Sequence, residues 1–167
     1  MSTTTHRTAT STADTAVSPC AALPEATRRV DALLAHYGLS HQHPTNETIH
    51  FVAIPLIMVS LVGLLFSLHP FVAVVFVAAS LVYYARLSRV FLVVMALITL
   101  PTLAFLHFLG AWVLPLSAAV FVLAWVMQFV GHKIEGKKPS FFEDLQYLWV
   151  GPLFVLSKLF IARGWRW

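Results

Sequence analysis

Apolar positions follow one another over two long blocks of the chain. No residue from 48 to 85 carries a formal charge, and none from 90 to 131 does. A helix needs about 20 consecutive apolar residues to cross a bilayer, so each block is long enough to cross twice. The pattern therefore predicts four membrane-spanning helices, at residues 49–68, 71–85, 90–109 and 112–130.

The chain ahead of these blocks has a different pattern. Residues 1–23 are rich in Ser, Thr and Ala and lack the apolar run of a secretory signal peptide, which predicts a disordered tail. Residues 24–167 would then form a single membrane-embedded domain. After Pro24 apolar residues recur at helical spacing as far as Tyr37, and Gly38 supplies a stop. We expect a short amphipathic helix here, lying on the membrane surface.

The last part of the chain is apolar but interrupted. It contains Gly151-Pro152 and a charged residue, Lys158, within a stretch that is otherwise apolar enough to enter a bilayer. This pattern favours a broken or re-entrant helix pair over a fifth full crossing, because helix breaks at membrane depth are tolerated where protein covers them. The pair would return to the side from which it entered.

Composition supports a membrane protein. Hydrophobic residues make up 59% of the 167 positions, charged residues 11%, and the mean hydropathy is +0.80, outside the balance of soluble domains. The expected fold class is all-α, a polytopic membrane helical bundle. The net charge of +4 is explained by Lys and Arg beside the spans, and nothing suggests a nucleic-acid partner.

Lys and Arg lie at alternate ends of the predicted spans. Arg28 precedes the first span, Arg86 and Arg89 join the second to the third, and Lys133 follows the fourth. Because cytoplasmic loops are enriched in Lys and Arg, we expect these three places, and the N-terminus, on the cytoplasmic side. The lack of targeting and retention signals favours a bacterial inner membrane over the endoplasmic reticulum.

Histidines gather at this same predicted face. His41, His43 and His50 precede or begin the first span, and His132 follows the fourth. The only cysteine, Cys20, lies in the tail, so any metal must be held by nitrogen and oxygen ligands. Two or three histidines with at most one carboxylate are the ligand set of non-haem iron oxygenases. Histidines that only contact lipid phosphates or backbone carbonyls are an equally good interpretation.

Polar residues near His132 are further candidates. Glu135 follows it by three residues, so both share one face of a helical turn, and Glu135 is a candidate ligand or orienting base. Lys137 and Lys138 could bind a substrate carboxylate or anionic membrane lipid. A basic flank at the cytoplasmic face is the simpler explanation of these two lysines.

The first predicted span has an N-terminal signature. Thr45 or Asn46 is the expected N-cap, and Glu47 lies in the first turn, where the helix dipole favours an acid. A cap at Asn46 would fix how the helix presents His50.

Two stretches together resemble a known family. They are "HQHPTNETIHFVAIP", which begins at His41, and "QFVGHKIEGKKPSFFEDLQYLWVGPLF", which begins at Gln128. In this order they resemble the 2-hydroxy fatty acid dioxygenase family, small polytopic membrane proteins related to the yeast endoplasmic-reticulum enzyme of fatty acid α-oxidation. Lys158 stands where many relatives have an acid, which argues against a role of that helix in holding metal.

The resemblance implies an Fe(II)-dependent dioxygenase that acts on a 2-hydroxy long-chain fatty acid and O2. Carried over by position, the ligands of Fe(2+) fall on His41, His50 and His132, whereas His43 matches a variable position. In this scheme Glu135 is a fourth ligand or supports the ligands, and a nearby lysine draws in the carboxylate. The shortened acid, CO2 and water balance the hydroxy acid and O2, so no other cofactor is required.

Two other functions stay open. A divalent-metal-binding or transport protein would be expected to carry ionisable residues inside its spans, and the second and fourth predicted spans have no charged residue or histidine. A non-catalytic membrane scaffold would make the histidines dispensable.

Overall fold

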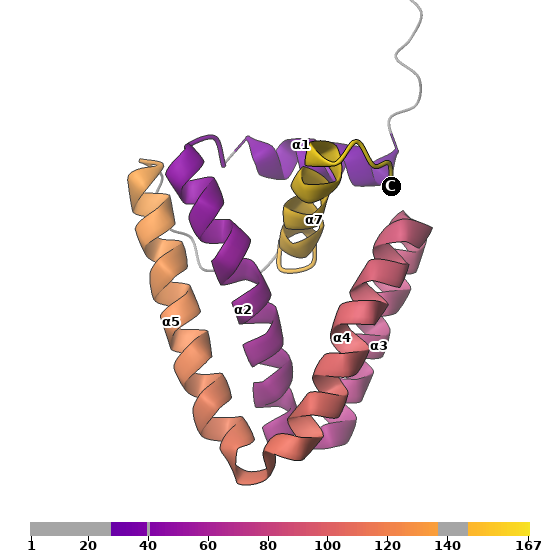
Figure 1. Ribbon diagram of the computed structural model, residues 1–167, viewed down its shortest axis with the longest axis vertical. Helices are drawn as coiled ribbons and strands as arrows, with labels where there is room; N and C mark the ends of the chain where they lie inside the picture. Colours follow the sequence, from indigo (N-terminus) through magenta and orange to yellow (C-terminus); the bar gives the residue numbers. More distant parts are fainter. Residues whose placement is uncertain (1–27, 40, 137–146) are drawn as a thin grey trace, which may run out of the picture.

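The computed structural model describes residues 28–39, 41–136 and 147–167 (Figure 1). All regular secondary structure in these ranges is helical, so the predicted all-α fold is confirmed. The elements are α1 (Arg29–Gly38), α2 (Pro44–Leu68), α3 (Pro70–Leu87), α4 (Arg89–Leu109), the 3-10 turn η1 (Gly110–Trp112), α5 (Val113–Ile134) and α7 (Val150–Ala162). The predicted tail, Lys137 and Lys138 lie outside the described residues.

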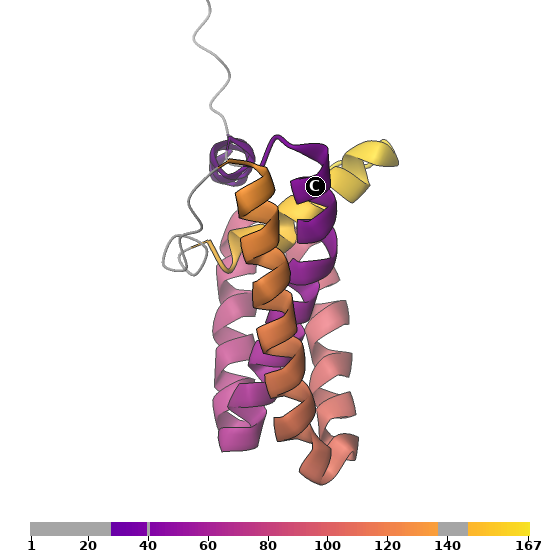
Figure 2. The same ribbon diagram turned by 90° about the vertical axis from the view of Figure 1, so that its left-hand side faces the viewer.

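Four long helices run up and down the molecule (Figure 1). α2 and α4 run away from the end at which α1 lies, and α3 and α5 run back toward it. α5 packs along α2, and α3 packs on both α2 and α4. In the view turned by 90°, α5 and α2 again lie side by side (Figure 2). The start of α2, the junction of α3 with α4 and the end of α5 therefore share one end of the bundle, as the charge pattern predicted.

Three helical stretches are long and apolar enough to cross a membrane. They are α2, α3 and the continuous run Arg89–Ile134, which contains α4, η1 and α5. This last run reverses its direction at η1 (Figure 1). Large apolar side chains along the outside, such as Leu97, Phe105 and Phe108, are exposed. An apolar outer surface of this extent is expected where a protein meets lipid or another apolar partner.

α1 is the amphipathic helix that the sequence predicts, and it ends at Gly38 as expected. Its buried side chains are Val30, Leu34 and Tyr37, which recur at the spacing of one helical face. This face packs against α7. The apolar stripe of α1 is therefore covered by protein, with the tilted rings of Tyr37 and Phe154 in contact at a centroid distance of 5.1 Å.

The predicted N-cap of the first span, Thr45 or Asn46, is wrong. α2 begins at Pro44, and its N-cap is His43, whose Nδ1 accepts a hydrogen bond of 3.2 Å from the backbone N–H of Thr45. Proline suits the first helical position because it has no N–H to leave unpaired. Glu47 does lie in the first turn, as predicted.

The same residue pair begins the next helix. The side chain of His69 accepts a hydrogen bond from the backbone N–H of Phe71 at 3.2 Å, and Pro70 takes the first position of α3. Ser88 caps α4 in the same way through its hydroxyl. One extended residue at each junction is therefore enough to end one helix and begin the next. His69 therefore has a structural role as the N-cap of α3.

The interruption predicted at Gly151-Pro152 is the start of a helix and not a break within one. Both residues lie in the first turn of α7, and the helix is continuous from Val150 to Ala162. A proline is tolerated there because the first N–H groups of a helix have no partner within it. At 13 residues α7 is too short to cross a bilayer, and its C-terminal end lies at the α1 end of the bundle (Figure 1). Much of the other half of the predicted pair lies in residues 137–146, outside the described residues.

Two glycines allow the close approach of α2 and α5. A Cβ on Gly63 would lie 2.0 Å from Oγ of Ser117, and a Cβ on Gly131 would lie 2.3 Å from Oδ1 of Asn46. Distances this short are not tolerated, so both contacts need a residue without a side chain. The two contacts lie near opposite ends of the helix pair and fix its spacing along its whole length.

We predict that Gly63→Ala destabilises the protein by about 1–3 kcal/mol, the usual cost of overpacking a core. Thermal unfolding in detergent measures the loss. In the double variant with Ser117→Gly the loss should be smaller than the sum of the two single losses, because the second change removes the clashing side chain. Additive losses would show that a side chain at position 63 does not clash with Ser117.

Candidate metal centre

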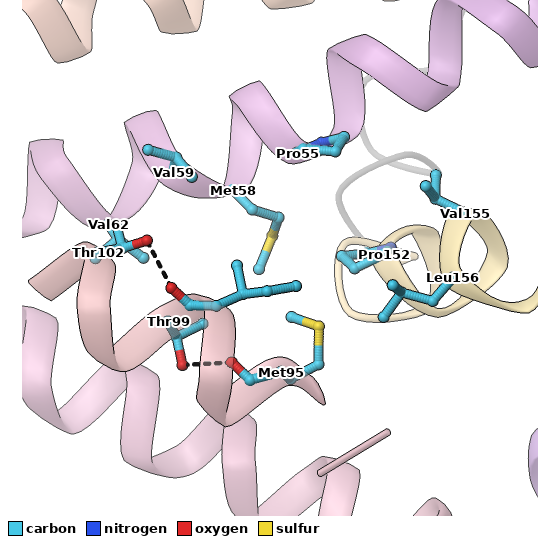
Figure 3. A pocket seen from close by; sticks show the side chains of 11 residues that line it. Pro55, Met58, Val59, Val62, Met95, Thr99, Thr102, Pro152, Val155 and Leu156 are labelled. Carbon is cyan, nitrogen blue, oxygen red and sulfur yellow. Dashed lines mark hydrogen bonds between the residues drawn. The ribbon is translucent and has the colours of Figure 1, made fainter. Parts of the chain in front are cut away.

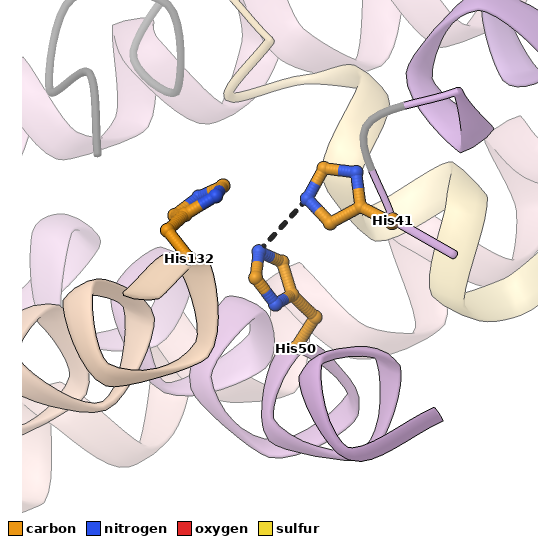
Figure 4. A group of neighbouring side chains, drawn as sticks. All are labelled: His41, His50 and His132. Atoms are coloured by element: carbon orange, nitrogen blue, oxygen red, sulfur yellow. Dashed lines mark hydrogen bonds between the residues drawn. The ribbon is translucent and has the colours of Figure 1, made fainter. Parts of the chain in front are cut away.

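Three histidines from distant parts of the chain meet at the α1 end of the bundle (Figure 4). His41 lies between α1 and α2, His50 lies in α2, and His132 lies in the last turn of α5. Ring centroids are 4.3 Å apart for His41 and His50, 5.1 Å for His50 and His132, and 5.5 Å for His41 and His132. All three are buried, and one nitrogen from each lies within 4.8 Å of the others.

Hydrogen bonds fix the protonation of two of these rings. Nδ1 of His41 lies 2.9 Å from the carbonyl oxygen of Tyr37, and Nδ1 of His50 lies 2.9 Å from that of Asn46. A carbonyl can only accept, so each Nδ1 carries the proton and donates it. In the neutral rings each Nε2 is therefore left with its lone pair. Metal-ligating histidines are oriented in this way, with the other ring N–H held by a carbonyl.

The two lone-pair nitrogens face each other. Nε2 of His41 lies 2.9 Å from Nε2 of His50 (Figure 4). Two lone pairs at this distance repel, so the pair needs either an extra proton or a cation that both can bind. Two imidazole nitrogens bound to one metal at about 2.1 Å, at right angles, lie roughly 3 Å apart. The donor set and its spacing fit a metal ion of the kind that imidazole prefers.

Aromatic rings support His41. The ring of Tyr37 stacks on it at a centroid distance of 4.2 Å with 11° between the planes, and Phe154 of α7 lies at 5.8 Å. The same Tyr37 supplies the carbonyl that holds Nδ1. α1 and α7 therefore hold the orientation of a histidine that lies in neither helix.

Glu135 ties the segment that carries His41 to the end of α5. Its two carboxylate oxygens accept hydrogen bonds of 2.9 Å from the backbone N–H groups of Gln42 and His43, and one also accepts from the side-chain amide of Asn46 at 3.1 Å. Partial burial raises the pKa of the Glu135 carboxyl, but these three hydrogen bonds outweigh it and lower the pKa, and His41 acts in the same direction. Glu135 is not in the group of three potential ligands.

Asn46 does not cap α2, but it contacts the site in other ways. Its backbone carbonyl accepts from His50, and its side-chain amide donates to Glu135. Its side chain is fully buried against Gly131, and its Oδ1 has no hydrogen-bond partner among the described residues. Asn46 therefore joins two of the predicted site residues to each other, and Gly131 leaves it the space to do so.

The remaining candidates lie apart from this group. His43 is exposed and caps α2, and it is the histidine that matches a variable position of the family. Lys158 forms an ion pair of 3.1 Å with Glu47 and lies over the ring of Phe154. Lys137 and Lys138 lie outside the described residues, so their predicted contact with a carboxylate stays a prediction.

Two cavities lie between the helices, and the three histidines line neither of them. The first, which we name the apolar cavity, has about 580 Å³ of empty space, part of it open, between α2, α4 and α7 (Figure 3). The second, the Gln128 cavity, is smaller, with about 310 Å³ of empty space that also includes space open to the outside. Neighbouring residues line the two: Ile54 and Gly151 line the Gln128 cavity, and Pro55 and Pro152 line the apolar cavity.

Sequence reasoning missed two residues, one in contact with the histidines and one in a neighbouring cavity. Tyr37 stacks on His41, and Gln128 is a buried polar residue on α5. Each precedes a histidine by four residues, Tyr37 before His41 and Gln128 before His132. This spacing puts two helical residues on one face, so it could have marked Gln128 in the apolar run of α5.

The fold and the site define a helical protein with a buried three-histidine centre and helices of membrane-spanning length. The chain belongs to the Mpo1-like family: the family described as 2-hydroxy-palmitic acid dioxygenase Mpo1-like matches residues 27–162. This confirms the resemblance that the two motifs carry. A search of curated proteins gave no match, and neither did a search of solved structures.

We predict that Glu135 stabilises the fold only while it is ionised. Its pKa is lowered in the folded state, so its contribution is present above the usual value of 4.5 and is lost as the pH falls through the folded value. Thermal unfolding of the protein and of Glu135→Gln between pH 3 and 7 measures this. The difference in melting temperature should be constant near neutral pH and shrink below about pH 4.5.

A gap that persists unchanged at pH 3 would mean that the carboxylate does not tie the two segments together.

Proposed function

We propose that this protein is an Fe(II)-dependent dioxygenase that removes one carbon from 2-hydroxy long-chain fatty acids. The observation that supports it most is the pair of Nε2 atoms of His41 and His50, which face each other at 2.9 Å inside a buried group of three histidines. The family description names a dioxygenase of 2-hydroxy-palmitic acid, and three imidazoles with open positions are a suitable set for Fe(II).

In this proposal His41, His50 and His132 hold the iron. When bound, it would bring O2 and the hydroxy acid together and supply the redox chemistry between them. The hydroxy acid gives four electrons to O2, and the products are the shortened acid, CO2 and water, so no external reductant is needed.

The residues around the histidines have positioning roles. Tyr37 and Asn46 hold the Nδ1–H groups through their carbonyls, which keeps each Nε2 directed at the metal position. Glu135 fixes the segment that carries His41 through two backbone hydrogen bonds. The buried setting excludes bulk water from the histidines, and Lys137 or Lys138 would draw the substrate carboxylate toward them.

The apolar cavity would take the acyl chain. Its walls are apolar side chains of α2, α4 and α7, and the hydroxyls of Thr99 and Thr102 donate to carbonyls of their own helix instead of facing the space as free polar groups (Figure 3). The carboxylate end would lie at the histidines, at the polar end of the bundle. We place this end at the cytoplasmic face of the membrane, with a bacterial inner membrane as the favoured location.

Replacing His50 or His132 by Ala should abolish both activity and metal binding. The protein is purified in detergent, reconstituted with Fe(II) without oxygen, and given 2-hydroxypalmitate and O2. Mass spectrometry follows the acid shortened by one carbon, and the iron bound per chain is measured separately. His69→Ala is the matched control, because His69 caps a helix at the other end of the bundle and should leave iron content and product unchanged.

The alternatives give different results in the same experiment. Iron-dependent product that survives in both variants would contradict the ligand assignment. Bound iron with no product would point to a metal-binding or transport protein, and no bound iron in the unaltered protein would favour a scaffold.

A bulky residue in the apolar cavity should shorten the preferred substrate. Val59 lines the cavity, and Val52 lies two turns earlier on an exposed part of α2 that lines neither cavity. Val59→Trp should lower the rate with 2-hydroxypalmitate about tenfold, which corresponds to the lost burial of about two methylene groups. The rate with 2-hydroxyoctanoate should not change. Val52→Trp should affect neither substrate; equal losses for both chain lengths would place the acyl chain elsewhere.

A further inference from the structure

The Gln128 cavity lies one helical turn deeper in the bundle than the three histidines. Ile54 follows His50 by four residues and Gln128 precedes His132 by four, and both line the cavity. α2 runs away from the α1 end and α5 runs toward it (Figure 1), so both residues lie on the inner side of the histidines. Four helical residues rise roughly 6 Å along the helix axis, so the cavity lies about that far from the level of the histidines.

Gln128 brings a buried polar atom to this cavity that has no hydrogen-bond partner among the described residues. Gln128 is 4% exposed, and its Oε1 makes no hydrogen bond with any described residue. Apolar side chains such as Ile54 and Ile57 form much of the cavity wall, which Tyr37 and Tyr147 complete. Burying a polar group without a partner costs free energy, so a buried glutamine in this position calls for a ligand that supplies a donor.

An amide side chain matches the head group of a 2-hydroxy acid. The amide offers an acceptor and a donor side by side, whereas the acid offers a hydroxyl donor and a carboxylate acceptor on adjacent carbons. A simple fatty acid has the carboxylate but no hydroxyl. The 2-hydroxyl is therefore the group that would donate a hydrogen bond to Oε1 of Gln128.

We propose that Gln128 is the residue that selects 2-hydroxy acids over unsubstituted fatty acids, by accepting a hydrogen bond from the 2-hydroxyl group. This inference rests on the proposed function, in which the same head group lies at the three histidines. To reach the apolar cavity, the acyl chain of the ligand would pass between Ile54-Pro55 and Gly151-Pro152, the neighbouring residues that line the two cavities.

Equilibrium binding to the metal-free protein tests this without turnover. Trp125 lines the same cavity, so its fluorescence reports an occupant, and Trp125→Phe should lose the signal. The ligands are 2-hydroxypalmitate, palmitate and 3-hydroxypalmitate, in which the hydroxyl is moved by one carbon. The unaltered protein should bind 2-hydroxypalmitate about tenfold more tightly than the other two, the order expected for one buried hydrogen bond made or lost.

Gln128→Met removes the amide and keeps the length of the side chain. It should reduce this preference to within about twofold, chiefly through weaker binding of 2-hydroxypalmitate. The matched control is Ser60→Ala, a buried polar residue on α2 whose hydroxyl bonds to its own helix and which should keep the tenfold preference.

The results that would contradict the proposal can be told apart. Equal binding of the three acids by the unaltered protein overturns the inference even if Gln128→Met fails to fold, and so does a preference that survives in Gln128→Met. A fluorescence change that persists in Trp125→Phe places the ligand elsewhere and also overturns it. A preference that depends on Gln128, together with no iron-dependent product, would reject the proposed reaction and leave Gln128 as part of a binding site for 2-hydroxy acids.

Discussion

The close packing of α2 on α5 is the constraint on which the site depends. His50 and His132 lie on these two helices, and their rings meet only because Gly63 and Gly131 allow the backbones to come together. Near Gly131 the space is filled by Asn46, whose carbonyl and amide also hold His50 and Glu135. The contact at Gly131 therefore sets both the spacing of the two helices at this end and the orientation of the groups between them.

The histidine pair carries an electrostatic cost that folding must offset. Two buried imidazoles that present lone pairs to each other at 2.9 Å are unfavourable as neutral groups. A bound cation would turn this repulsion into two favourable contacts, so metal binding and the stability of this end of the bundle are linked. The carboxylate of Glu135 adds a negative charge that interacts with His41, which also favours a cation.

Much of this arrangement could be predicted from the sequence. Charge placement grouped His41, His50 and His132 at one end, because the spans alternate in direction and the uncharged loops mark the other end. The cap of α2 was missed because a His-Pro pair replaces the usual Ser, Thr, Asp or Asn. The helical spacing of Glu135 and His132 suggested a shared role, but the contacts of Glu135 with Gln42 and His43 are set by tertiary packing. Gln128 lies in an apolar run of the sequence, and only the cavity beside it in the structure suggests a function for it.

The order of the histidines along the chain has a consequence for how the protein is made. His41 and His50 are synthesised before most of the apolar sequence, whereas His132 comes at the end of the last long helix. The ribosome releases the chain from its N-terminus, so α5 becomes available for packing only after α2. The group of three histidines is therefore complete only after α5 has packed beside α2, so a metal ion held by all three would bind late and would mark a chain whose long helices are all in place.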